Sequence, residues 1–446
     1  MVSRITIVLI AMLLMFVTGA AAQPEADSPL LEMLARVPAL PTNRGMITFA
    51  DFEAIETAYA PAQRPHDWAA FQAWQDSEED APENLPYLLW WVVFGRFSSA
   101  ESARFLMEAG NMPAALGIDY FEIDQELNYG TPPEASDQLA GDFDLDVVRA
   151  AFAARGYTQA ASDDVELWCG EVGCEGGLTV NPRNRLVSNP FGGELGRIQP
   201  LLIEDNALIS SPGIEAIEDH IAVAAGEARS LADAREYQAA VNAMTTDGTL
   251  LQAMFVDGEP LLRFATTSPA TTLGLFSPQM TAEQRAEILR RLLEDYETLP
   301  QFTLLAIADV VTETEQQARL ILIYSSREDA ERAAELLPGR IAAYQSMMVR
   351  RQLTELLEER HVEDIRYEVV EDGAANRTAL VIAFAAQKGT PEEIVQFNQM
   401  LLDPSGYPPV AFPGALFRTF AQMVVSADLG WLSTVPREEI EALLEE

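Results

Sequence analysis

The chain has 446 residues, of which 48% are hydrophobic, and 69 acidic against 29 basic residues give it a formal net charge of −40. This hydrophobic share excludes a disordered chain, and the length predicts two domains around sizeable cores. The acid excess argues against nucleic acid and anionic membranes as partners, because like charges repel over about one Debye length. A single lysine, Lys388, also argues against Schiff-base chemistry.

The amino terminus has the pattern of a Sec-type signal sequence. Arg4 precedes an apolar run, and a small-x-small cleavage motif ends at Ala22. We predict a signal peptide at residues 1–22 and a polar tether at 23–44. Gln23 follows the cleavage motif where a lipoprotein would need a cysteine. An uncleaved signal anchor is the alternative, since the apolar stretch approaches the roughly 20 residues that span a bilayer.

Residues 45–267 are predicted to form a first domain of mixed helices and strands. Thr48 and Asp51 have the spacing of a capping box, which predicts a helix that begins at residue 48. The apolar segment 85–94 is too short to cross a bilayer and is predicted to be a buried core element. Asp144 is predicted to cap a helix. Helices are also predicted from 67, from 98, over 145–155, 214–225 and 232–244, and strands at 139–143, 165–168, 197–203, 207–209, 250–256 and 261–266.

The two cysteines of the chain, Cys169 and Cys174, are separated by a short loop that contains glycine. In an exported protein, such a close pair predicts a disulfide across a tight loop. Closing so small a ring contributes only about 2 kcal/mol, so the bond would fix a hairpin tip. Free thiols are the first alternative. Zinc is the second, and it would need further cysteine or histidine ligands.

A linker is predicted at residues 268–280, which are rich in Ser, Thr, Pro and Gly, and a second domain at 281–446. Ser326 is predicted to cap a helix that ends at Leu337, and Gly339 to separate it from a longer helix. Helices are predicted at 281–299, 326–337, 340–361, 391–402 and 413–426, and strands at 302–311, 318–324, 365–370 and 378–384. This order predicts an α+β fold with two domains, in which helices pack on one face of antiparallel sheets.

Three segments of the first domain resemble recurring segments of uncharacterised exported bacterial envelope proteins and lipoproteins of unknown function. They are MPAALGIDYFEIDQELNYGTPP, GDFDLDVVRAAFAARGY and SLADAREYQAAVNAM. The resemblance covers the chain from Thr48 to Met244 and implies a bacterial cell-envelope setting. It supplies no catalytic residue. The chain differs from the lipoproteins because it lacks the lipidated cysteine.

We assign no catalytic, cofactor-binding or metal-binding residue from the sequence. An acidic run at 142–146 has the start of a calcium loop, but Val147 and Ala153 occupy the positions that need glycine and glutamate. The histidines occur singly, without the spacing of metal ligands. The chain has no GxSxG motif and no Walker lysine. These histidines are His66, His220 and His361.

The sequence therefore predicts an extracytoplasmic, non-enzymatic binding or interaction protein of the cell envelope, secreted or periplasmic, without a cofactor. Its partner would be a protein or a small ligand rather than nucleic acid, and no membrane span is expected beyond the leader. The alternative is a secreted hydrolase that uses carboxylates or a Ser/His site. A hydrolase predicts a deep cleft where acids or a Ser-His pair converge, whereas a binding module predicts an apolar groove or an exposed sheet edge.

Overall fold

The structure is a computed structural model, and it describes residues 28–77, 82–100, 108–131, 133–160, 165–258, 261–263, 266, 281, 297–346, 349–399, 412–436 and 438. The predicted signal peptide and the predicted linker lie outside these residues. So do most of the helices predicted from 98 and at 281–299.

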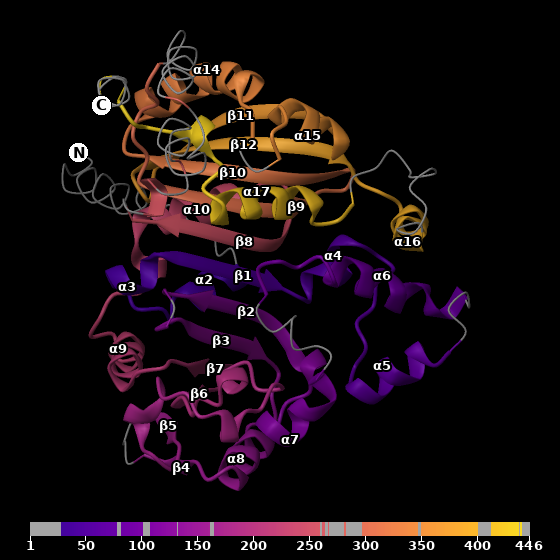
Figure 1. Ribbon diagram of the computed structural model, residues 1–446, viewed down its shortest axis with the longest axis vertical. Coiled ribbons are helices and arrows are strands. Elements are labelled where there is room, and N and C mark those ends of the chain that lie inside the picture. Colours follow the sequence, from indigo (N-terminus) through magenta and orange to yellow (C-terminus); the bar gives the residue numbers. More distant parts are fainter. Residues whose placement is uncertain are drawn as a thin grey trace, which may run out of the picture.

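Twelve strands of the described residues form one antiparallel sheet in the order β11-β12-β10-β9-β8-β1-β2-β3-β7-β6-β5-β4, which Figure 1 shows from one edge to the other. The α+β class with antiparallel strands is confirmed. The strands are β1 Met46–Asp51, β2 Ile123–Tyr129, β3 Ser136–Gly141, β4 Thr158–Gln159, β5 Glu166–Cys169, β6 Leu201–Glu204, β7 Ala207–Ser210, β8 Thr249–Asp257, β9 Leu304–Val311, β10 Glu315–Tyr324, β11 Val362–Asp372 and β12 Arg377–Gln387.

Strand β8 joins the two halves of the chain into this one sheet. Its Phe255 stands opposite Ile47 of β1 on one side and opposite Ala306 of β9 on the other. The sheet thus continues from the predicted first domain into the predicted second domain. The division of the chain into two domains stays a prediction.

Helices cover both faces of the sheet, whereas the sequence predicted helices on one face. On one face α2 and α10 pack on Phe49, Phe255 and Ile321, and on the other α14 and α17 pack on Ile307 and Leu320. The bounds are α2 Pro29–Leu34, α3 Pro41–Arg44, α4 Ala54–Ala58, α5 Trp68–Gln75, α6 Leu85–Phe94, α7 Met112–Leu116, α8 Leu145–Ala154, α9 Ile214–Ala224, α10 Arg235–Thr245, α14 Arg327–Ala343, α15 Leu353–Glu359, α16 Pro391–Gln399 and α17 Ala415–Val425.

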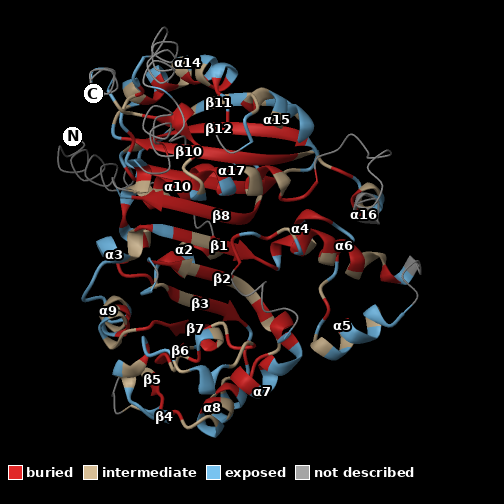
Figure 2. Ribbon diagram, in the orientation of Figure 1, coloured by how far each residue is buried: buried red, intermediate tan, exposed pale blue. Residues whose placement is uncertain are grey.

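Cover on both faces explains the composition of the central strands. All eight residues of β9 are buried, and nine of the ten residues of β10 are (Figure 2). A strand with one solvated face alternates apolar and polar residues, whereas a strand covered on both faces is apolar almost throughout. The segment LLAIADVV of β9 departs from this rule at one position, Asp309.

Four predicted elements of this fold are wrong, and one of them is the helix predicted at 340–361, of whose described residues only Leu353–Glu359 form a separate helix, α15. Residues 46–51 form strand β1 rather than the start of a helix, because Ile47 and Phe49 alternate into the core. Residues 261–263 are helical and pair with no strand. Helix α14 begins at the predicted cap Ser326 but continues through Gly339 to Ala343, since Leu337 and Ile341 keep one face in the core.

The structure also differs from the prediction of a polar tether up to residue 44. From Ser28 onward this segment is folded, and Leu30, Met33 and Leu34 of α2 are buried. These side chains pack with Tyr237 in the cluster under α10. A short apolar segment with polar flanks gains stability by covering part of a sheet face, and this gain is not visible in the local pattern.

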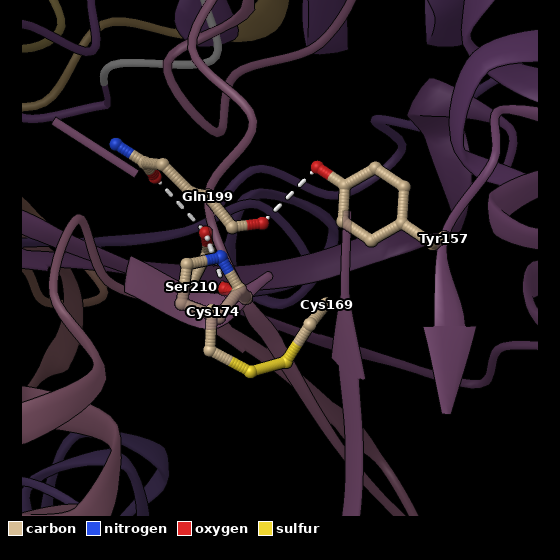
Figure 3. Close-up of a disulfide and its surroundings, with 6 residues drawn as sticks. Tyr157, Cys169, Cys174, Gln199 and Ser210 are labelled. Atoms are coloured by element: carbon tan, nitrogen blue, oxygen red, sulfur yellow. Dashed lines mark hydrogen bonds between the residues drawn. A yellow bond between two sulfur atoms is a disulfide. The ribbon is translucent and has the colours of Figure 1, made fainter. Parts of the chain in front are cut away.

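The disulfide between Cys169 and Cys174 is present, and the two Cα atoms lie 4.8 Å apart. Figure 3 shows the bond beside a small hydrogen-bonded cluster, in which Tyr157 donates to the Gln199 carbonyl (3.1 Å) and Ser210 donates to the Gln199 side chain (3.0 Å). The bond closes the loop after β5, which lies next to the edge strand β4.

Removal of both cysteines, in the variant Cys169→Ser/Cys174→Ser, is expected to lower the free energy of unfolding by about 2 kcal/mol, because the unfolded chain gains freedom. Chemical denaturation of wild type and variant without reductant measures this change. With reductant present throughout, the two proteins are expected to unfold at the same denaturant concentration. Equal stability under oxidising conditions would show that the bond contributes nothing.

Candidate functional site

A cavity of about 390 Å³ lies where β1 ends, on the face of the sheet that α2 and α10 cover. The first residues of α2, the end of α10, the start of β8 and the start of α4 line it, together with Phe49 and Asp51 of β1 and Gln125 of β2. We call this the Asp51 cavity.

Asp51 is the buried carboxyl group of this cavity, with only 7% of its surface exposed. Ile47, Phe49 and Asp51 alternate on one face of β1, so the strand places a carboxylate in a row of core side chains. The Ala54 amide, at the first residue of α4, donates a hydrogen bond to Asp51 Oδ1 at 3.0 Å. Burial raises the pKa of Asp51 to about 6, although the hydrogen bonds from Ala54 and Gln125 act in the opposite direction.

The wall of the Asp51 cavity carries negative charge only. Glu53 is the other charged side chain among the described residues that line it, and α2, α10 and β8 contribute hydroxyl and apolar groups. Glu53 and Asp124 further raise the pKa of Asp51 by repulsion, and Asp124 is itself paired with Arg64 at 2.7 Å. The cavity therefore combines a mostly apolar lining with a buried carboxyl that has no basic side chain beside it among the described lining residues.

A second, wider hollow of about 610 Å³ lies at the end of β8, beside Asp257 and Arg263. Its buried acid is already engaged, because Asp257 accepts a hydrogen bond from Tyr237 Oη at 3.0 Å and lies 3.5 Å from Arg44. Burial raises the pKa of Asp257, and Arg44 opposes this effect. Of these two cavities, the Asp51 cavity is the one whose buried acid has no basic side chain beside it among the described lining residues. A ligand could supply the missing positive charge.

The histidines do not form a hydrolase site with a serine in the described part of the chain. His220 is buried, with Nε2 2.6 Å from Tyr129 Oη and Nδ1 2.7 Å from the Arg36 carbonyl oxygen, and burial lowers its pKa to about 4. Both ring nitrogens are thus occupied. His66 lies on the surface, 3.3 Å from Asp67. His361 occupies the turn between α15 and β11 with a φ of 58°.

The acidic run at 142–146 lies at the start of α8. Asp144 accepts hydrogen bonds from the amides of Asp146 and Val147 and so is the predicted cap, while Asp146 pairs with Arg149 at 2.7 Å. Within the described residues, no group of three or more His, Cys, Asp or Glu side chains has the arrangement of a metal site. None of the described helices is long and apolar enough to cross a bilayer.

The sequence placed Asp51 in a capping box and missed its role in the cavity. The available signal was the alternation of Ile47, Phe49 and Asp51, in which an acid stands where an apolar residue is expected. This alternation predicts that Asp51 is buried. It does not predict that α2 and α10 lie beside Asp51 and line the cavity.

No family model and no curated protein matches the chain. Among solved structures, crystal forms of TP0453 are distantly similar. Crystal form III has a TM-score of 0.32 at 9% identity and covers 82% of this chain and 98% of that one. Crystal form IV gives 0.32 at 8% identity, with coverages of 83% and 98%, and crystal form I gives 0.30 at 7% identity, with 81% and 94%. The likeness is distant and carries no inference about function.

Proposed function

We propose that this chain is an exported, non-enzymatic binding protein that holds a small molecule in the Asp51 cavity. The observation that carries the proposal is a half-enclosed space of about 390 Å³ with a mostly apolar lining and several polar groups. Such a combination, together with a group of perturbed pKa, is typical of ligand sites in proteins. Most of the exposed lining is apolar, and Asp51, Gln125 and Thr249 supply polar groups.

Two features support an extracytoplasmic location. The amino-terminal pattern is that of a secretion signal, and Cys169 and Cys174 form a disulfide, which persists in oxidising compartments. Fractionation of the source cells is expected to place the mature chain, beginning at Gln23, outside the cytoplasm. Full-length chain in the cytoplasm with both thiols reduced would overturn this part of the proposal.

Filling the Asp51 cavity tests the binding function. Thr249→Leu, or Ser28→Leu on the opposite wall, is expected to abolish binding of any small molecule that raises the melting temperature of the wild-type chain in a thermal-shift screen. The physical reason is that the larger side chain occupies the space of the ligand. Thr303→Leu, which alters the wider hollow instead, is the matched control and is expected to leave binding unchanged.

If a small molecule still binds to Thr249→Leu and Ser28→Leu, the two variants that fill the cavity, but no longer binds to Thr303→Leu, the site lies in the wider hollow beside Asp257. That result would overturn the proposal.

The non-enzymatic part of the proposal has its own measurement. Esterase, peptidase and glycosidase substrates are expected to show no turnover with the purified mature chain. Turnover that disappears in Asp51→Asn would identify the chain as a hydrolase.

A further inference from the structure

We propose that the ligand of the Asp51 cavity is an organic cation, a molecule with an ammonium group on a compact apolar body. This inference rests on the proposed function, since it names the chemical class that the same cavity takes. In this arrangement the ammonium group faces Asp51 and the apolar body lies against the apolar atoms of the cavity lining.

The charge of the wall selects the class of ligand. A buried carboxylate is stable only when it is paired or protonated, because water no longer solvates it. Asp51 accepts hydrogen bonds from the Ala54 amide and from Gln125, which leave its charge unneutralised. Of two other buried acids, Asp257 lines the wider hollow and Asp309 lines neither cavity. Asp257 lies near Arg44, and Asp309 accepts hydrogen bonds from Gln252 (3.1 Å) and Gln316 (3.4 Å).

Asp51 differs because its cavity presents no basic side chain among the described residues that line it. An anionic ligand would meet Asp51 and Glu53 and be repelled by both. A neutral ligand would leave the ionised carboxylate uncompensated. A ligand ammonium group supplies the missing charge and donates the charge-assisted hydrogen bond that Asp51 can still accept. The formal net charge of −40 also favours the approach of cations over anions.

The apolar character of the lining argues for an organic cation rather than a metal ion. Most of the exposed surface that lines the cavity belongs to apolar atoms. Calcium requires about six to eight oxygen ligands, several of them usually carboxylates, whereas the cavity lining has one buried and one exposed carboxylate beside neutral hydroxyl and amide groups. An alkyl or aryl body removes this surface from water while the ammonium group remains beside Asp51.

Binding of a cation is expected to depend on pH through Asp51. The carboxyl must be ionised to pair with an ammonium group, and burial holds its proton until about pH 6. Affinity should therefore be constant above about pH 7 and fall as the pH drops below the pKa of Asp51. The charged groups that act on Asp51 are Glu53 and Asp124, and Arg64 neutralises Asp124.

Calorimetric titration of the mature chain with three matched compounds tests the class. At about pH 7.5, benzylammonium is expected to bind, whereas benzyl alcohol and benzoate, which have the same ring, are expected to bind at least about tenfold more weakly. Asp51→Asn keeps an oxygen to accept from the Ala54 amide, and it is expected to weaken benzylammonium binding by at least about tenfold. Glu53→Gln, at the exposed rim, is the matched charge control, and it is expected to lower the affinity for benzylammonium far less than Asp51→Asn does.

The outcomes separate this inference from the proposed function. If benzoate or benzyl alcohol binds best and Thr249→Leu abolishes that binding, the cavity is a ligand site and the cationic class is wrong. If calcium or magnesium raises the melting temperature and Asp51→Asn removes the effect, the site holds a metal ion and the class is again wrong. If no compound of any charge binds in a way that the filling variants block, the proposed function itself fails. Equal affinity of benzylammonium for wild type and Asp51→Asn would also overturn the inference.

Discussion

Replacement of Phe255 by alanine is expected to lower the free energy of unfolding by about 3–5 kcal/mol, because a large buried ring is lost and the cavity cannot close. Phe255 is fully buried in β8, and its ring lies 5.2 Å from that of Tyr237 in α10. Since β8 pairs with both β1 and β9, the loss should weaken both halves of the sheet at once.

Hydrogen exchange measured along a urea titration checks this coupling. Peptides from β1–β3 and from β10–β12 are expected to lose protection in one transition, which moves to lower urea in Phe255→Ala for both. Val172→Ala is the control, because Val172 is 63% exposed and its loss should change stability by less than about 0.5 kcal/mol. Two separate transitions, of which the substitution moves only one, would instead support the predicted division into two domains.

Substitution of Asp309 by asparagine is expected to stabilise the protein at about pH 8, by up to about 3 kcal/mol. Asp309 is the acid within the buried strand β9, 1% exposed, and burial raises its pKa to about 6. Gln252 donates a hydrogen bond to Asp309 Oδ2 at 3.1 Å. Ser99 donates one to the Gln252 side-chain oxygen at 3.0 Å, so the orientation of the Gln252 amide is fixed. Gln316, at 3.4 Å, can rotate to accept from the new asparagine amide.

The direction of this effect follows from proton linkage. The folded state keeps the Asp309 proton up to about pH 6, whereas the unfolded chain releases it near its ordinary pKa of about 4. Between these values the folded state binds more protons, so the stability contributed by Asp309 is present below about pH 4 and is lost as the pH rises to about 6. Asparagine carries no charge to bury and avoids this loss.

Denaturation midpoints at about pH 4 and pH 8 give the measurement, and the difference between Asp309→Asn and wild type should appear only at the higher pH. His220, whose pKa is lowered to about 4, loses its contribution as the pH falls, but it is the same in both proteins and cancels. Asp205→Asn, in the exposed turn after β6, controls for the change in net charge and should show no such difference. A destabilised Asp309→Asn at about pH 8 would mean that the lost hydrogen bond outweighs desolvation of the charge.

Local patterns were sufficient for the short-range features of the fold. Asp144 and Ser326 cap the predicted helices, Gly156 has the left-handed conformation that ends α8, and Cys169 and Cys174 pair across their loop. In each case the partner groups lie within a few residues, so spacing alone specifies the hydrogen bond or the ring that forms. The buried segment 85–94 was predicted for a similar reason, since its composition allows no solvated face.

Pairing between segments that are far apart in the chain determined the features of the fold that local patterns did not predict. Residues 46–51 have a helix-cap pattern, but the pairing of β1 with β2 and β8 stabilises the strand more than one turn of helix could. The same pairing places Asp51 under α2 and α10, and so creates the cavity from segments that are far apart in the chain. Periodicity reports which side of a segment is buried, whereas the neighbour that buries it is chosen by packing over the whole sheet.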